Sequence, residues 1–215
     1  MPRANRYFTE GRYYHVTHRC HNRSSLLKFM RDRDEYRAML RKRLPRYDLS
    51  LLGYCLTSNH VHLLFRAASR EAIAGLMQSL AGDFSSSYNR RKRRSNAFWG
   101  ERYHTTLVEG AQHLWRCLRY IDLNMVRVGI VSHPREWAWC GYQEIAGSRR
   151  RYCLVDTEQL LDGLGENLSL ATFRDAYEAD IADRIQRDEL ARDARWTESL
   201  AVGSKSFVER TQATI

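Results

Sequence analysis

The sequence predicts an α+β fold, namely an antiparallel sheet in the split β-α-β order of ferredoxin-like proteins, with helices on one face and a helical C-terminal extension. Short segments rich in β-branched and aromatic residues alternate with longer segments whose apolar residues recur at helical spacing. Their order is strand, helix, strand, strand, helix, strand, helix. The chain has 215 residues, of which 43% are apolar, so it is long enough for one catalytic domain with its own core.

The first strand is expected at residues 13–19, and a helix follows it. Asp32 and Glu35 resemble a capping box at the start of this helix, and Pro45 ends it. Its apolar stripe consists of Tyr36, Met39, Leu40 and Leu44. A short polar turn, Thr57, Ser58 and Asn59, then joins strands at 49–56 and 60–66 into a hairpin.

The second helix should begin near Ser69 and run into a basic cluster that starts at Arg90. Its apolar stripe consists of Ile73, Leu76, Met77, Leu80, Phe84 and Tyr88. A further strand is expected at 103–108, and a third helix at 111–124. We place the catalytic domain at residues 1–150 and an acidic, mainly helical extension at 151–215. An amphipathic helix in the extension is indicated by Phe173, Tyr177, Ile181 and Ile185.

Charge is distributed unevenly along the chain. Residues 1–155 carry 28 basic and 12 acidic side chains, whereas residues 156–215 carry 7 and 13. A surface with such a basic excess attracts phosphate over long distances, which favours nucleic acid as the partner. The 5 Trp and 12 Tyr residues supply rings on which exposed bases could stack.

The five cysteines include no CxxC pair, which argues against a disulfide framework or a zinc knuckle. No segment has the apolar core of a secretion signal or the roughly 20 apolar residues that span a bilayer. We therefore expect reduced thiols, no membrane partner and a cytoplasmic location.

A pair of histidines, His60 and His62, lies inside one predicted strand. Strand alternation sends both imidazoles to one face and Val61 to the other, so two nitrogen ligands could meet there on the free surface of the sheet. Two ordinary surface histidines would give the same pattern.

The third helix adds a tyrosine and an asparagine to this picture. Tyr120 and Asn124 are one helical turn apart, on a polar face beside the apolar stripe. Asn124 could complete a metal site with the histidines, and the phenol would then reach a phosphate on that metal. Alternatively, Tyr120 caps the core and Asn124 bonds to the backbone near the helix end.

A tyrosine suits phosphoryl transfer when a cation is present. Its ordinary pKa of about 10 makes it a weak nucleophile, but a cation on the scissile phosphate stabilises the transition state. Attack leaves a phosphotyrosine and a free hydroxyl. Because the covalent bond conserves the phosphodiester energy, a second hydroxyl can later reseal a strand without ATP.

Four sequence blocks carry a family resemblance across most of residues 6–145. They are YHVTHR at 14–19, NHVHLLF at 59–65, FWGERYH at 98–104 and LRYIDLNMVRVG at 118–129. In this order they resemble the single-tyrosine HUH transposases, and among these the REP-associated tyrosine transposases of bacteria. Met125 departs from the usual pattern, which has proline there, so the third helix is expected to run on slightly.

The resemblance implies a ferredoxin-like fold and a set of site residues. His60, His62 and Asn124 would bind Mg²⁺ or Mn²⁺, and Tyr120 would form a 5′-phosphotyrosine. The substrate would be single-stranded DNA folded into hairpins from repetitive extragenic palindromes, with a short guide sequence beside each hairpin. The resemblance also implies a nucleoid-associated protein and a monomer, with the dimer of more distant transposases as the alternative.

Basic residues are expected to contact DNA phosphates without reading bases. The densest run comprises Arg90, Arg91, Lys92, Arg93 and Arg94, and Arg12, Arg19 and Arg102 are expected to flank the site. His15 lies beside them on the first strand and could equally be a core histidine.

Two other functions are compatible with the sequence. A hairpin-binding repressor or architectural protein would have lost useful catalysis, although it would have no need of both histidines, the tyrosine and the asparagine. An RNA-binding sheet domain would carry aromatic residues on its exposed strands in place of paired histidines. We also expect the acidic extension to restrain activity or to shape hairpin recognition.

Overall fold

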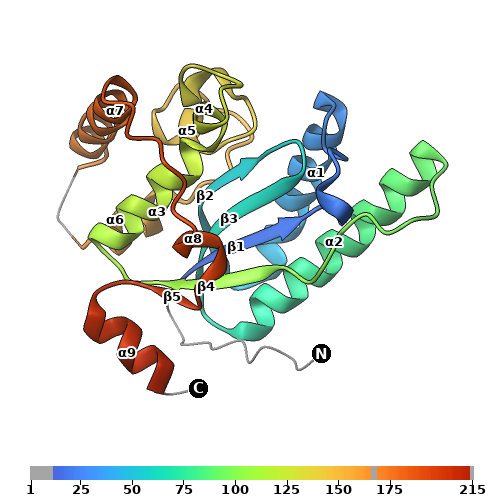
Figure 1. Ribbon diagram of the computed structural model, residues 1–215, viewed down its shortest axis with the longest axis horizontal. Helices are drawn as coiled ribbons and strands as arrows, with labels where there is room; N and C mark the ends of the chain where they lie inside the picture. The colour runs from blue at the N-terminus through green and yellow to red at the C-terminus, as the bar shows by residue number, and fades with distance from the viewer. Residues whose placement is uncertain (1–11, 166–168, 214–215) are drawn as a thin grey trace.

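A five-stranded sheet forms the centre of the molecule in the computed structural model, which describes residues 12–165 and 169–213 (Figure 1). The strand order is β2-β3-β1-β4-β5. The strands are β1 (Arg12–Arg19), β2 (Leu49–Leu56), β3 (His60–Ala67), β4 (His104–Val108) and β5 (Ala201–Val202). The first four pair antiparallel in the expected split β-α-β order, and β5 adds a short parallel pairing to β4. The predicted fold class is confirmed.

Two long helices, α1 (Met30–Arg43) and α2 (Arg70–Lys92), cover one face of this sheet. His18 of β1 stacks on Trp99 at 4.0 Å, and Trp99 in turn contacts Tyr36 of α1 and Phe84 of α2. Ser69 caps α2 by accepting a hydrogen bond from the Ala72 amide, as its position predicts.

The predicted capping box at the start of α1 is wrong. The helix begins after Phe29, which provides no side-chain cap. Asp32 is buried and pairs with Arg91 of α2 at 2.7 Å. Its carboxylate therefore joins α1 to α2 and does not satisfy the backbone of its own helix.

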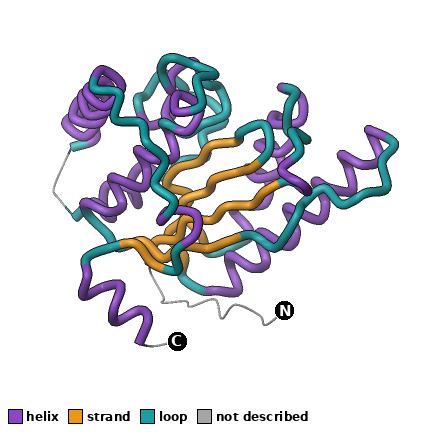
Figure 2. Tube along the Cα trace, viewed as in Figure 1, coloured by secondary structure: helices purple, strands orange, loops and turns teal. Residues whose placement is uncertain are grey.

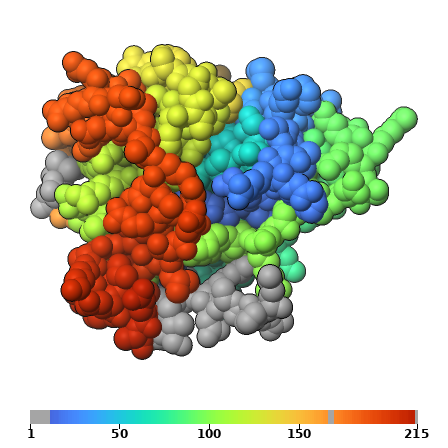
Figure 3. Space-filling view, in the orientation of Figure 1, coloured from blue at the N-terminus to red at the C-terminus, as the bar shows by residue number. Residues whose placement is uncertain are grey.

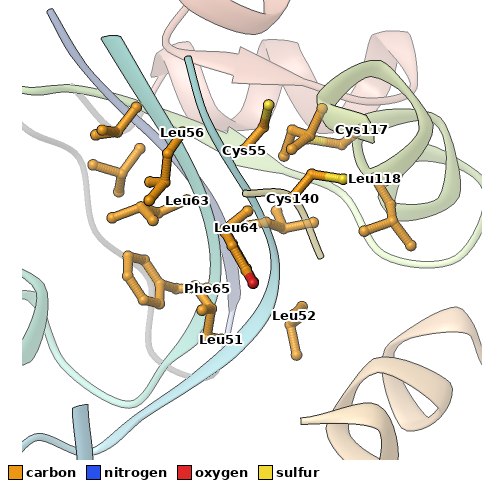
Figure 4. Close-up of a cluster of buried hydrophobic side chains, with 14 of the residues drawn as sticks. Leu51, Leu52, Cys55, Leu56, Leu63, Leu64, Phe65, Cys117, Leu118 and Cys140 are labelled. Atoms are coloured by element: carbon orange, nitrogen blue, oxygen red, sulfur yellow. The ribbon is translucent and has the colours of Figure 1, made fainter. Parts of the chain in front are cut away.

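The expectation that helices lie on one face only is also corrected, because α3 (Gln112–Asp122) packs on the opposite face. A Cβ on Gly53 of β2 would lie 2.5 Å from Leu118 of α3, so helix and strand are in close contact. Figure 4 shows Cys55 and Leu118 on one side of the strands and Leu63 and Phe65 on the other. The unbroken apolar run at residues 51–56, all buried, signals a strand covered on both faces.

The third helix ends where the candidate site begins. Leu123 leaves helical geometry with ψ near 2°, so α3 stops at Asp122 and a separate turn, α4 (Asn124–Arg127), follows. The helix therefore does not run on past Asn124, although Met125 supplies a backbone N–H where the usual proline has none.

The remaining elements lie around the sheet (Figure 2). They are η1 (His21–Arg23), η2 (Leu44–Arg46), η3 (Pro134–Glu136), α5 (Tyr142–Ile145), α6 (Thr157–Leu164), α7 (Leu170–Gln186), α8 (Arg195–Glu198) and α9 (Lys205–Ala213). The predicted amphipathic helix is α7, whose Phe173, Tyr177 and Ile181 are buried.

The C-terminal extension packs closely on the rest of the chain. The Tyr177 hydroxyl donates to Asp122 at 2.8 Å, and the Trp115 indole donates to Asp180 at 2.6 Å. After α7 the chain runs across α3 and the sheet, and its surface covers part of them in Figure 3. A domain boundary near residue 150 stays a prediction.

The five cysteines are free thiols, and only Cys153 is exposed. In the described part of the chain no helix is both long and apolar enough to cross a membrane.

Candidate active site

The two histidines of β3 lie near the end of α3, on the face of the sheet that α3 covers. The rings of His60 and His62 lie 4.6 Å apart, and the Tyr120 ring lies 6.0 Å from that of His62. Asn124 Nδ2 is 3.1 Å from His62 Nε2. Strand alternation places both imidazoles on the face that α3 covers, and the break at Leu123 directs Asn124 towards them.

Hydrogen bonds fix which nitrogen of His60 carries a proton. The Asn59 amide donates to the Arg23 carbonyl at 3.1 Å, so its oxygen faces His60 Nδ1, 2.6 Å away. An oxygen in that position accepts, and His60 Nδ1 therefore donates. The lone pair of His60 is then on Nε2.

His62 is held by another histidine. His62 Nδ1 lies 2.8 Å from His15 Nε2, and His15 Nδ1 lies 2.8 Å from the carbonyl oxygen of Trp196. Burial lowers the pKa of His15 to about 4 and that of His60 to about 3, and it takes the pKa of His62 well below the ordinary 6.5. All three imidazoles are therefore neutral at neutral pH.

This donor set fits a divalent cation. Neutral imidazole is the form that binds metals, and an asparagine oxygen is a ligand for hard cations. Within the described residues no group of three or more His, Cys, Asp or Glu could hold a metal ion. A metal here would thus be held by His60, His62 and Asn124 together with oxygens of substrate or water. Asn124 now presents its nitrogen to His62, so its amide would have to rotate to offer Oδ1.

Tyr120 is nearly enclosed, with 7% of its surface exposed. Burial raises the pKa of its phenol, and two cations oppose this: the Arg127 guanidinium, 4.5 Å from the ring centre, and Arg192, which hydrogen-bonds to the phenol. The hydroxyl is therefore protonated at neutral pH, beside two groups that would stabilise its anion.

Two cavities border the site. The first, of about 780 Å³, is bordered by His60 and by Arg19, Arg23, Arg102 and Arg192. The second, of about 230 Å³, is bordered by Tyr120 and by Arg116, Arg119, Arg127 and Arg195. Residues 191–198, which we call the α8 segment, contribute to the walls of both cavities. This segment thus lies between the His60 side and the Tyr120 side.

Residues 9–124, more than half of the chain, match the family described as IS200-like transposases. The chain belongs to the IS200-like transposase family. Both candidate histidines, Tyr120 and Asn124 lie inside the matched region of this transposase.

Solved structures support the fold of the transposase. A REP-associated tyrosine transposase bound to a REP hairpin matches with a TM-score of 0.56 at 15% identity, over 68% of this chain and 86% of the other. A candidate transposase from Deinococcus radiodurans R1 matches with a TM-score of 0.37 at 18% identity, over 49% of this chain and 84% of the other. Among curated proteins no match was found.

The structure separates the basic residues that were expected around the site of the transposase. Arg19 and Arg102 border the first cavity beside His60. Arg12 does not flank the site, because it lies at the other end of β1, opposite Ala67, while Arg19 lies opposite His60.

The basic run at the end of α2 also divides. Arg91 pairs with buried Asp32 and with Glu35, so it is not available to a phosphate. Arg90, Lys92 and Arg93 are exposed, and Arg94 is half-buried against the Tyr88 ring. The run lies at the opposite end of the molecule from α3 (Figure 1). Contact of the run with DNA stays a prediction.

Several residues at the site were not singled out from the sequence. Arg127, three residues after Asn124, could have been found from helical spacing, since it faces Tyr120 from the next turn. Arg192 and Trp196 come from the extension and gave no local signal. His15 was noted without a choice between core and site, and it is both buried and bonded to His62.

Proposed function

We propose that this transposase is a metal-dependent single-stranded DNA endonuclease and strand transferase that acts through a 5′-phosphotyrosine at Tyr120. The observation that supports this most is the convergence of Tyr120, His62 and Asn124 from separate elements. The ring centres of Tyr120 and His62 lie 6.0 Å apart, and Asn124 Nδ2 lies 3.1 Å from His62 Nε2. Such an enzyme would both cut and rejoin DNA strands.

In the proposed reaction the Tyr120 oxygen bonds to phosphorus and the bond from phosphorus to the 3′ oxygen breaks. The phenol loses its proton, and the leaving DNA strand ends in a 3′ hydroxyl. Mg²⁺ or Mn²⁺ held by His60, His62 and Asn124 would supply positive charge at the scissile phosphate. Arg127, over the Tyr120 ring, stabilises the phenolate, and Arg19 and Arg102 hold neighbouring phosphates along the first cavity.

The proposed substrate is single-stranded DNA that carries hairpins of the REP type. Four blocks of the sequence resemble the REP-associated group, and the structure solved with a REP hairpin shares the fold. We propose that the transposase acts as a monomer, because α3 is fixed to its own chain through the bond between Asp122 and Tyr177.

The decisive experiment compares the wild-type chain with Tyr120→Phe on a labelled hairpin single strand, with Mg²⁺ or Mn²⁺ and with chelator. The wild-type protein should form a covalent adduct at the 5′ end of the downstream product, only with metal. Tyr120→Phe should bind the DNA but form no adduct. Trp115→Phe serves as a control, since this aromatic residue of α3 bonds to Asp180 away from the histidines. An adduct of equal yield in Tyr120→Phe would remove Tyr120 as nucleophile.

A hairpin-binding protein with weak catalysis is the second candidate. The position of the α8 segment between the two cavities favours it, because the segment separates the cavity beside His60 from the cavity beside Tyr120. In that case the wild-type chain and Tyr120→Phe would bind the hairpin equally, and neither would form an adduct under any metal condition.

A further inference from the structure

His15 occupies a place in the site that its burial alone does not explain. It lies in the middle of β1, on the same sheet face as His62, and is completely buried. Both of its ring nitrogens are within hydrogen-bond distance of a partner, at 2.8 Å from the Trp196 carbonyl and 2.8 Å from His62. An apolar residue of similar size would fill the space but could make neither bond.

The Trp196 carbonyl determines which atom donates in each hydrogen bond of the chain from Trp196 through His15 to His62, which we call the relay. A carbonyl oxygen can only accept, so His15 Nδ1 carries the proton of the neutral ring and Nε2 has the lone pair. His15 Nε2 then accepts from His62 Nδ1, which leaves the lone pair of His62 on Nε2. The Asn124 amide nitrogen faces that atom as a donor, which agrees with the assignment.

We infer that His15 is a positioning residue that fixes His62 in the tautomer whose Nε2 can bind a metal, and that the Trp196 carbonyl in the extension sets the relay. The inference rests on the proposed function in so far as it assigns a metal to His62. Asn59 fixes the tautomer of His60 in the same way, because its oxygen accepts from His60 Nδ1 while its amide nitrogen donates to the Arg23 carbonyl. Both imidazoles thus keep the lone pair on Nε2, the nitrogen left to bind a metal.

Free imidazole prefers the proton on Nε2, and a buried His62 without His15 would keep a polar nitrogen without a partner. Outer partners of metal-bound histidines typically contribute 10- to 100-fold in metal affinity. His15 should therefore matter for metal loading even though it would not touch the metal.

Three variants of the full chain separate this role from packing. His15→Leu removes both bonds. His15→Gln keeps them, since its amide nitrogen can donate to the Trp196 carbonyl and its oxygen can accept from His62. His18→Leu is the matched control, a buried histidine of the same strand on the other face, bonded to the Glu101 carbonyl and stacked on Trp99.

The first measurement is the imidazole tautomer, read without metal from long-range ¹H–¹⁵N spectra of chains labelled at histidine. His62 should be protonated at Nδ1 in the wild type, in His15→Gln and in His18→Leu, and should shift towards Nε2 protonation in His15→Leu. The second is Mn²⁺ affinity, which should fall about 10- to 100-fold in His15→Leu and only a few-fold in the other two.

The outcomes are distinguishable from those of the proposed function. A His62 protonated at Nε2 in the wild type, or an unchanged tautomer and Mn²⁺ affinity in His15→Leu, overturns the inference while the nuclease proposal stands. Loss of affinity in His15→Gln equal to that in His15→Leu would reduce His15 to a packing residue. If the wild-type chain binds no Mn²⁺, the metal role is overturned both in this inference and in the proposed function.

Discussion

Asp122 lies two residues after Tyr120, and its carboxyl group is completely enclosed. One carboxylate oxygen accepts from the Tyr177 hydroxyl at 2.8 Å, while the other has no hydrogen-bond partner among the described residues. Burial raises the pKa of Asp122 to about 8, so the carboxyl group is protonated in the folded protein at neutral pH. This acid connects the tyrosine helix to α7 as a neutral group.

The raised pKa of Asp122 predicts how stability depends on pH. Between about pH 4 and 8 the folded chain binds a proton here that the unfolded chain has lost, so the free energy of unfolding falls as pH rises, by up to about 1.4 kcal/mol per unit. The contribution is fully present below the unfolded pKa and is lost above about 8.

Asp122→Asn keeps an acceptor for Tyr177 and cannot ionise. Denaturant titrations should show the variant more stable than wild type at pH 8, with the difference disappearing near pH 4. Equal pH slopes for the two proteins would mean that Asp122 ionises normally in the folded state.

At the scale of elements, the contact between β2 and α3 places the tyrosine over the histidines. Gly53 leaves room for Leu118, and no other residue type fits that distance without a shift of the helix side chains. The bulge between Leu51 and Gly53 in the pairing with β3 turns Gly53 onto the α3 face. The position of α3, and with it that of Tyr120, therefore depends on the absence of a side chain at Gly53.

Gly53→Ala should destabilise the protein by about 1–3 kcal/mol, because the added methyl group overlaps a buried leucine. It should also slow adduct formation by displacing Tyr120. Gly82→Ala is the matched control: it lies within α2, its added methyl group meets nothing within 4 Å, and it should stabilise by about 0.5–1 kcal/mol. Thermal unfolding and adduct yield, measured on both, check this. Equal stability of the two variants would refute the close packing of α3.

At the scale of the whole molecule, the surface has a basic end and a covered centre. The exposed part of the run at the end of α2 lies far from α3, and the first cavity, rich in arginine, borders His60. A hairpin held at the basic end could thus extend a single strand along the cavity towards the histidines.

The exposed and the paired cations of the run should behave differently. Neutralising Arg90, Lys92 and Arg93 together should reduce the slope of log affinity against log salt by about 2–3, because each phosphate contact contributes nearly one unit. Arg91→Gln should leave the slope unchanged but cost about 3 kcal/mol of stability, since it strands the buried Asp32. Salt titrations of hairpin binding measure the first effect. A slope that the triple variant and Arg91→Gln both share with the wild type would place the DNA elsewhere.

The covered centre predicts a movement on substrate binding. In Tyr120→Phe, a hairpin with a flanking single strand across the cleavage site should increase hydrogen exchange in the α8 segment, because the strand must pass between the cavities that the segment divides. A hairpin without the flanking strand should cause no change. Unaltered or slower exchange with the longer DNA would show that the segment stays in place.

The sequence by itself determined the order of the strands and helices along the catalytic part of the chain and the four candidate residues, because strand alternation and helical spacing depend only on near neighbours. It placed His60 beside His62 on one face of a strand, and their rings lie 4.6 Å apart, but on a covered face; it put Asn124 on the helix of Tyr120, whereas Asn124 follows the end of that helix and contacts His62. The apolar run of β2 also indicated that the second face of the sheet is covered, although we expected that face to be free.

Only the tertiary structure decided what surrounds these residues. It separated Arg91 from Arg90, placed Arg12 away from the site and brought the α8 segment between the two cavities. The relay from Trp196 through His15 to His62 spans 181 positions in its first step. No local pattern reports such a contact, because it exists only when distant segments are packed against each other and a buried nitrogen must find its partner.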